Sequence, residues 1–115
     1  MKGESELENS KTYYGGTFLD EKDLAETRSN HKIELEYYTT KAYGEVNEES
    51  ETYGVEIVKK EYEGTEVKIE LNYHENICNN INKINEVIEI LKRCKVTPMG
   101  LDDVIEEIYK RAITE

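Results

Sequence analysis

The sequence predicts an α+β fold, in which a three-stranded antiparallel meander carries two C-terminal helices packed on one face. Two observations lead to this prediction. Apolar and polar residues alternate in three segments between residues 32 and 73, and apolar residues then recur at spacings of three and four between residues 75 and 112. Alternation with a period of two is typical of strands with one buried face, whereas the second spacing is typical of amphipathic helices.

The length of 115 residues is enough for one domain. Residues 1–31 are rich in Glu, Lys, Ser, Asn and Gly, which predicts a flexible N-terminal tail with Gly15-Gly16 as its most flexible point. A sharper alternative is that this tail orders on a partner through Tyr13-Tyr14 and Phe18-Leu19. Residues 32–113 are expected to form the single α+β domain.

The three strands are expected at Lys32–Lys41, Thr52–Glu61 and Thr65–Tyr73, with an acidic loop at Gly44–Glu51 between the first two. Each strand keeps its apolar side chains on one parity, and the residues expected to face the core are Ile33, Leu35, Tyr37, Tyr53, Val55, Ile57, Val67, Ile69, Leu71 and Tyr73.

The turn between the second and third strands follows from the assumption that both strands face the same core. A three-residue loop, Tyr62-Glu63-Gly64, would pair Ile57 with Ile69 and keep both side chains on that face. Three-residue hairpin loops end with a left-handed residue, and the glycine occupies that place. A two-residue loop at Glu63-Gly64 would instead turn Ile57 away from its partners.

The first helix is expected at Glu75–Cys94, with Asn76 as its N-cap. Its apolar stripe consists of Ile77, Ile81, Ile84, Ile88 and Leu91. The second helix is expected to begin at Thr97-Pro98 and to end near Ala112, because proline is tolerated in a first helical turn. Its buried residues are expected to be Leu101, Val104, Ile105, Ile108 and Ala112.

The net charge of −11 is concentrated in residues 32–75, which hold five basic and twelve acidic side chains. Such a surface repels phosphate backbones and anionic lipids, so direct binding to nucleic acid or to a membrane is not expected. The sequence has no apolar run long enough for a signal sequence or a membrane span, which predicts a cytoplasmic protein. Cys78 and Cys94, expected about 24 Å apart on one helix, cannot pair and fit a reducing compartment.

The sequence predicts no enzyme, no cofactor and no metal site. His74 and Cys78 are four residues apart, but no CxxC or HxxxH pattern completes a set of ligands. The acidic residues of the second helix lack the alternating oxygen ligands and the central glycine of a calcium loop. The serines fall in the tail or in a loop, and no glycine-rich loop leads from a strand into a helix.

Two segments resemble a known family. They are Tyr53–Lys59, reading YGVEIVK, and Val96–Glu107, reading VTPMGLDDVIEE. Over roughly Ile33 to Tyr109, the chain is similar to small uncharacterised proteins of clostridia and related Firmicutes that are catalogued as a domain of unknown function. The resemblance implies no activity, cofactor or binding residue.

The function expected from these observations is that of a cytoplasmic protein-interaction or regulatory module. It would bind a protein partner through an acidic, tyrosine-bearing outer sheet face or through an edge strand. The residues expected to take part are Glu34, Glu36, Tyr38, Glu56, Lys68 and Glu70.

Three alternatives stay open. One is an acidic mimic of nucleic acid that binds a basic protein. Another is a small enzyme or metal protein built around His74, Cys78 and the carboxylates of the second helix, Asp102, Asp103, Glu106 and Glu107. The third is a homodimer, which would cover the open sheet edges.

Overall fold

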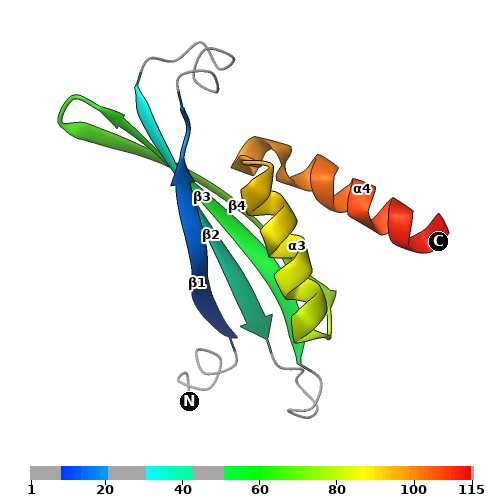
Figure 1. Cartoon of the computed structure of the whole chain (residues 1–115). Helices are drawn as coiled ribbons and strands as arrows, with labels where there is room; N and C mark the ends of the chain where they lie inside the picture. The colour runs from blue at the N-terminus through cyan, green and yellow to red at the C-terminus, as the bar shows by residue number, and fades with distance from the viewer. Residues whose placement is uncertain (1–8, 21–30, 43–50, 115) are drawn as a thin grey trace, which may run out of the picture.

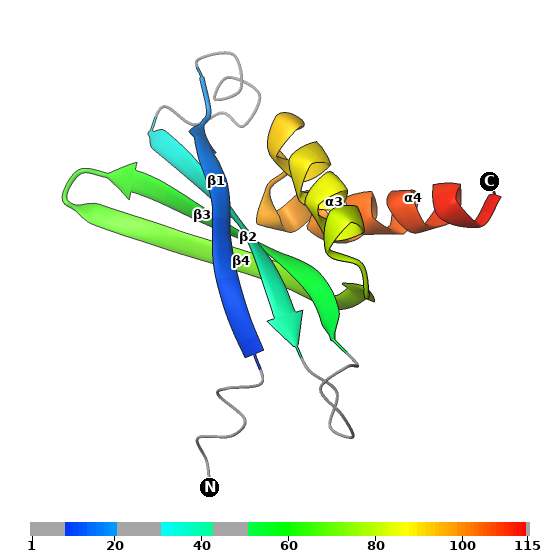
Figure 2. The same cartoon turned by 60° about the horizontal axis from the view of Figure 1, so that its bottom comes forward.

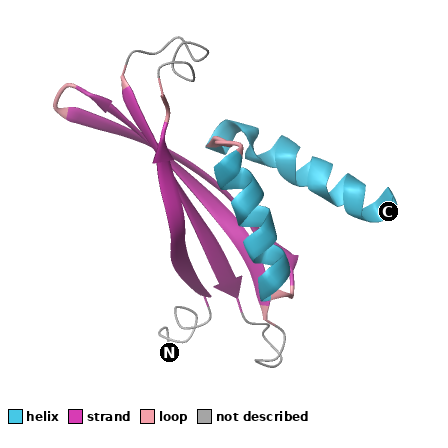
Figure 3. Ribbon diagram, in the orientation of Figure 1, coloured by secondary structure: helices cyan, strands magenta, loops and turns pink. Residues whose placement is uncertain are grey.

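The computed structural model describes residues 9–20, 31–42 and 51–114. It is an α+β structure with one four-stranded antiparallel sheet in the order β1-β2-β3-β4, followed by two helices joined through a short 3-10 turn (Figures 1 and 3). The elements are β1 (Asn9–Phe18), β2 (Lys32–Ala42), β3 (Thr52–Glu63), β4 (Glu66–Cys78), α3 (Ile81–Arg93), η1 (Pro98–Gly100) and α4 (Leu101–Thr114).

Both helices lie on the same side of the sheet, as the sequence predicts (Figure 2). We call this side the inner face and the opposite side the outer face. No helix of the described residues covers the outer face, and the molecule is correspondingly flat, with extents of 48 × 42 × 18 Å.

The prediction of three strands is wrong, because part of the segment interpreted as a tail forms β1. This strand pairs antiparallel with β2 and has a bulge between Tyr13 and Gly15. The two glycines serve close packing: a Cβ at Gly15 would lie 2.9 Å from Cε of Lys92, and one at Gly16 would lie 2.9 Å from the carbonyl oxygen of Leu35. Residues 1–8 and 21–30 of the predicted tail lie outside the described residues.

The core lies between the inner face and the helices. The alternation of β2 and β3 is confirmed, since Leu35, Tyr37 and Ile57 are fully buried. The Tyr37 hydroxyl donates a hydrogen bond of 2.9 Å to the carbonyl oxygen of Val96, which ties β2 to the segment between the helices. The remaining core residues are Leu19, Ile33, Val55, Ile84, Val87, Ile88, Leu91, Val96, Leu101 and Ile105.

The predicted register of the β3–β4 hairpin is wrong. A two-residue loop, Gly64-Thr65, connects the strands, so Ile57 lies opposite Asn72 rather than opposite Ile69. Gly64 does have the expected left-handed backbone, with φ at +63°. Because Thr65 does not share it, the positive φ falls only on the first loop residue, as in a type II′ turn.

This register reverses the faces of β4. Leu71 lies opposite Val58, and Ile69 lies opposite Lys60, so both point to the outer face. The polar residues of β4 point to the inner face instead. There, the side-chain amide of Asn72 donates hydrogen bonds of 3.1 Å both to the carbonyl oxygen of Pro98 and to Oδ1 of Asp102.

The first predicted helix begins too early. β4 continues through Cys78, and Asn76 has a φ of 58° in the strand instead of capping a helix. The N-cap of α3 is Asn80, whose side chain accepts hydrogen bonds from the backbone N–H groups of Asn82 and Lys83 at 2.8 and 3.0 Å. The start of the predicted stripe therefore fails, and Ile81 is 53% exposed.

The second predicted helix is confirmed in position as η1 followed by α4. Leu101 and Ile105 are buried, while Val104 and Ile108 are partly buried against the core. The side chain of Ala112 and the acidic loop up to residue 50 lie outside the described residues. Both cysteines are free, but they occupy different elements, because Cys78 ends β4 and Cys94 is the C-cap of α3.

We expect Gly54→Ala to destabilise the hairpin. A Cβ at this position would lie 2.1 Å from the carbonyl oxygen of His74 and 2.7 Å from Cα of Glu75, and both are backbone atoms. Displacing them should lower the free energy of unfolding by about 1–3 kcal/mol, as overpacking usually does. Urea denaturation measures this loss. Gly100→Ala is the matched control, since its Cβ would have no neighbour closer than 3.8 Å, and an equal loss in both variants would contradict the argument.

Candidate interaction surface

The outer face is the surface on which most of the predicted partner-binding residues meet. The part of this face that β1, β2 and β3 form is mostly polar, and its charged side chains pair with one another. The Tyr38 hydroxyl donates to Oε1 of Glu36 at 2.9 Å, and Nζ of Lys60 lies 3.1 Å from the other oxygen of the same carboxylate. The Tyr62 hydroxyl donates to Glu34 at 2.8 Å, so neither carboxylate lacks a partner.

Aromatic rings extend this surface onto β1. The rings of Tyr13 and Tyr38 meet edge to face with centroids 5.5 Å apart. Nζ of Lys11 lies 4.5 Å from the centroid of the Tyr38 ring and 3.2 Å from a carboxylate oxygen of Glu56. These contacts hold the exposed Tyr13 and the half-buried Tyr38 in one arrangement.

The part of the outer face formed by β4 is apolar. We call it the β4 stripe, and its residues, with their exposed fractions, are Val67 (46%), Ile69 (59%), Leu71 (53%) and Tyr73 (54%). All four point away from the core on a strand at the edge of the sheet. Single exposed apolar residues are common on soluble proteins, whereas a row of four on an edge strand is a feature that calls for an explanation.

The predicted partner-binding residues divide between the two faces. Glu34, Glu36, Tyr38 and Glu56 lie on the outer face, whereas Lys68 and Glu70 lie on the inner face. Their separation follows from the two-residue turn, which places even-numbered residues of β4 on the side of the helices. The alternation of β4 predicts that its stripe faces the core, and this prediction is wrong. In the sequence, only a turn that begins with glycine signals the true orientation of the strand.

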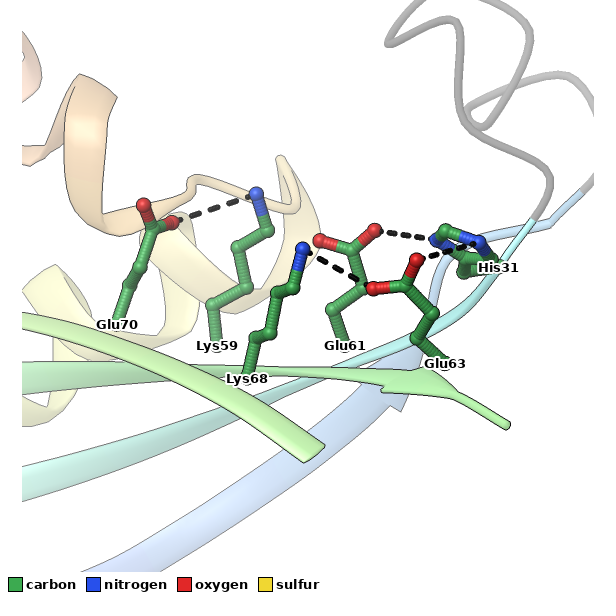
Figure 4. A network of polar contacts seen from close by, with 6 residues as sticks. All are labelled: His31, Lys59, Glu61, Glu63, Lys68 and Glu70. Carbon is green, nitrogen blue, oxygen red and sulfur yellow. Dashed lines mark hydrogen bonds and ion pairs between the residues drawn. The ribbon is translucent and has the colours of Figure 1, made fainter. Parts of the chain in front are cut away.

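Beyond the helices, the inner face of the hairpin carries a network of polar contacts, shown in Figure 4. Nζ of Lys68 lies 3.0 Å from Glu63, and Nζ of Lys59 lies 3.4 Å from Glu70. The remaining members of this network are His31 and Glu61. Nδ1 of His31 lies 2.7 Å from the Glu61 carboxylate, and Nε2 of His31 lies 3.6 Å from the Glu63 carboxylate. The hydrogen bond from His31 lowers the pKa of the Glu61 carboxyl below its usual range.

His74 and Asp102, named in the metal-site alternative, contact each other. Nε2 of His74 lies 2.7 Å from Oδ1 of Asp102, which also accepts a hydrogen bond from Asn72. The bonds from His74 and Asn72 lower the pKa of the Asp102 carboxyl. Within residues 9–20, 31–42 and 51–114, no three His, Cys, Asp or Glu side chains come together in a metal-binding arrangement. The contact between these residues therefore joins β4 to α4.

The Glu36 carboxyl is the best-supported charge of the outer face. Partial burial on its own raises the pKa of Glu36, but the hydrogen bonds from Tyr38 and Lys60 outweigh burial and hold the pKa below its ordinary value. A carboxyl with a lowered folded-state pKa stabilises the fold above its unfolded-state pKa. This contribution is lost as the pH falls through the folded-state value.

We expect Tyr38→Phe to raise the pKa of Glu36, because it removes one of the two donors and keeps the aromatic ring. The variant should also lose stability relative to the wild type at neutral pH, and this difference should shrink in acid. Carbon-13 NMR titration of the Glu36 carboxyl measures the shift. Tyr53→Phe is the control, since that hydroxyl donates to Glu51 instead. Identical Glu36 midpoints in the wild type and Tyr38→Phe would refute the assignment.

The model of a family of unknown function, DUF6514, matches residues 18–111. No curated protein and no solved structure matches the sequence. The matched range runs from the last residue of β1 through most of α4, so it includes β2, β3 and β4 and the residues of the outer face that they contribute. The chain therefore belongs to the family of unknown function DUF6514.

Proposed function

We propose that this protein is an interaction module that binds another protein molecule through the outer face of its sheet. The observation that carries the proposal is the β4 stripe, in which four apolar side chains on one edge strand are each about half exposed. Burying such side chains against a partner removes apolar area from water, which is the main driving force of protein association.

The surroundings of the stripe support this proposal. Val58 lies beside Leu71 on the outer face and is only 8% exposed, so the apolar surface of the stripe continues onto a buried residue of β3. Paired charges and tyrosine hydroxyls border it on β2 and β3, and those directly opposite the stripe are Glu56, Lys60 and Tyr62. An apolar centre with a polar border is the usual anatomy of a protein interface.

The acidic-mimic alternative has less support. A phosphate mimic needs carboxylates presented to a basic partner, but the carboxylates of Glu34, Glu36 and Glu56 are held by partners within the same face.

The described residues contain no helix long and apolar enough to cross a membrane. The cytoplasmic location, the Firmicutes origin and the absence of enzymatic activity stay predictions from the sequence.

We expect Leu71→Glu to weaken partner binding. A carboxylate introduced at the centre of the β4 stripe would have to be buried without a partner, which should weaken binding by about tenfold or more. The measurement is a pull-down of the tagged full-length chain from native extract at low and moderate salt, with quantitative mass spectrometry of the retained proteins.

Met99→Glu is the matched control, because it places the same charge on an apolar residue that is 86% exposed and lies on η1. Its retained proteins should equal those of the wild type. Equal retention by Leu71→Glu and the wild type, together with equal self-association of the two in sedimentation, would overturn the proposed function, since the stripe would then contribute nothing to any association.

A further inference from the structure

The edge of β4 has the features of a strand that pairs with another strand. β4 is an outermost strand of the sheet. Glu63 and Glu66 are the last pair before the two-residue loop, and in such a hairpin this pair is hydrogen-bonded. Hydrogen-bonded pairs then recur at every second residue, so the N–H and C=O groups of even-numbered residues in the adjoining part of β4 point toward β3. The N–H and C=O groups of Val67, Ile69 and Leu71 consequently point to the free edge. They are the residues whose side chains form most of the β4 stripe.

Charges on β4 identify the strand that would fit this edge. Edge strands are commonly protected by a lysine, which disfavours pairing with an arbitrary strand. Lys68 has this position, but Glu70 follows two residues later on the same face. In Figure 4, both side chains rise from the hairpin on the side of the helices. A partner strand with the opposite order of charges would match both residues, and an antiparallel copy of β4 presents that order.

From this self-complementarity we propose that the occupant of the β4 edge is a second copy of the chain. The inference rests on the proposed function and names its partner. Two β4 strands would pair antiparallel around a two-fold axis at Ile69 and join the two sheets into one of eight strands. Ile69 would lie opposite Ile69 of the second copy, and Val67 opposite Leu71 of the second copy, so the two stripes would pack side by side.

The charges select this register from its neighbours. With Ile69 at the axis, Lys68 lies opposite Glu70 of the second copy, and the two-fold axis repeats this pair. A shift that moves the axis to Glu70 would bring two glutamates together, and a shift to Lys68 would bring two lysines together. Pairings between an odd and an even residue would place backbone groups out of register.

Sedimentation of the full-length chain between about 1 μM and 1 mM tests the pairing, since edge-to-edge contacts are small and dissociate in this range. We expect a reversible dimer of twice the 13.4 kDa chain mass. Ile69→Lys should raise its dissociation constant at least tenfold, whereas Ile81→Lys should not. These two isoleucines are 59% and 53% exposed, so neither variant should unfold the protein.

Cross-linking tests the register, and it is carried out in a Cys78→Ser, Cys94→Ser background because both native cysteines are free. Directly paired residues in an antiparallel ladder have Cα atoms about 5.5 Å apart, within the reach of a disulfide. Ile69→Cys should therefore form a covalent dimer on mild oxidation. Glu70→Cys and Ile81→Cys should form little.

A wild-type chain that stays monomeric up to about 1 mM would overturn the inference. A dimer that survives Ile69→Lys unchanged would overturn it as well. In both cases the proposed function is judged separately by the loss of retained proteins in Leu71→Glu. That loss would show that the stripe binds a different protein.

Discussion

The two-residue turn at Gly64-Thr65 is the constraint on which the surface of this protein depends. Side chains alternate along a strand, so a loop longer by one residue would exchange the faces of β4 completely. Gly64 provides the positive φ that the short loop requires. At the other end of the hairpin, the β4 backbone passes so close to Gly54 that a side chain would not fit. The register is thus held at both ends.

The polar face of β4 shows why the reversed orientation is stable. Near the helices, Asn72 and His74 bond to η1 and α4. Beyond the helices, Lys68 and Glu70 join the ion pairs of the hairpin. Each of these polar groups has a partner on the inner face, and turning the strand over would remove all of these contacts. The β4 stripe is therefore exposed because the opposite side of the strand makes these hydrogen bonds and ion pairs on the inner face.

Sequence patterns were sufficient where one residue pattern has one structural explanation. The alternation of β2 and β3 and the apolar spacing of α4 predict their elements and buried faces correctly. The pattern of β4 has two explanations, because a strand that faces a core and a strand that faces a partner alternate alike. Helix α3 begins after Asn80 rather than after the predicted cap Asn76, and the Gly15-Gly16 pair predicts flexibility where the structure has the strand β1. Pairing with β2 decides the structure of β1. Local contacts decide the other two, because the cap at Asn80 sets the start of α3 and the turn at Gly64-Thr65 sets the faces of β4.

The distribution of charge explains why the proposed contact would centre on the edge of the sheet. Covering the middle of the outer face would remove the ion pairs of Glu36 and Glu56 from water, and the desolvation of such pairs opposes their burial. Covering β4 would bury mainly hydrocarbon and backbone groups that a second strand can satisfy. The polar part of the outer face on β2 and β3 would therefore disfavour the stacking of two sheets face to face. Under the proposed function, a partner would therefore approach along β4, where the apolar stripe and the free edge of the sheet coincide.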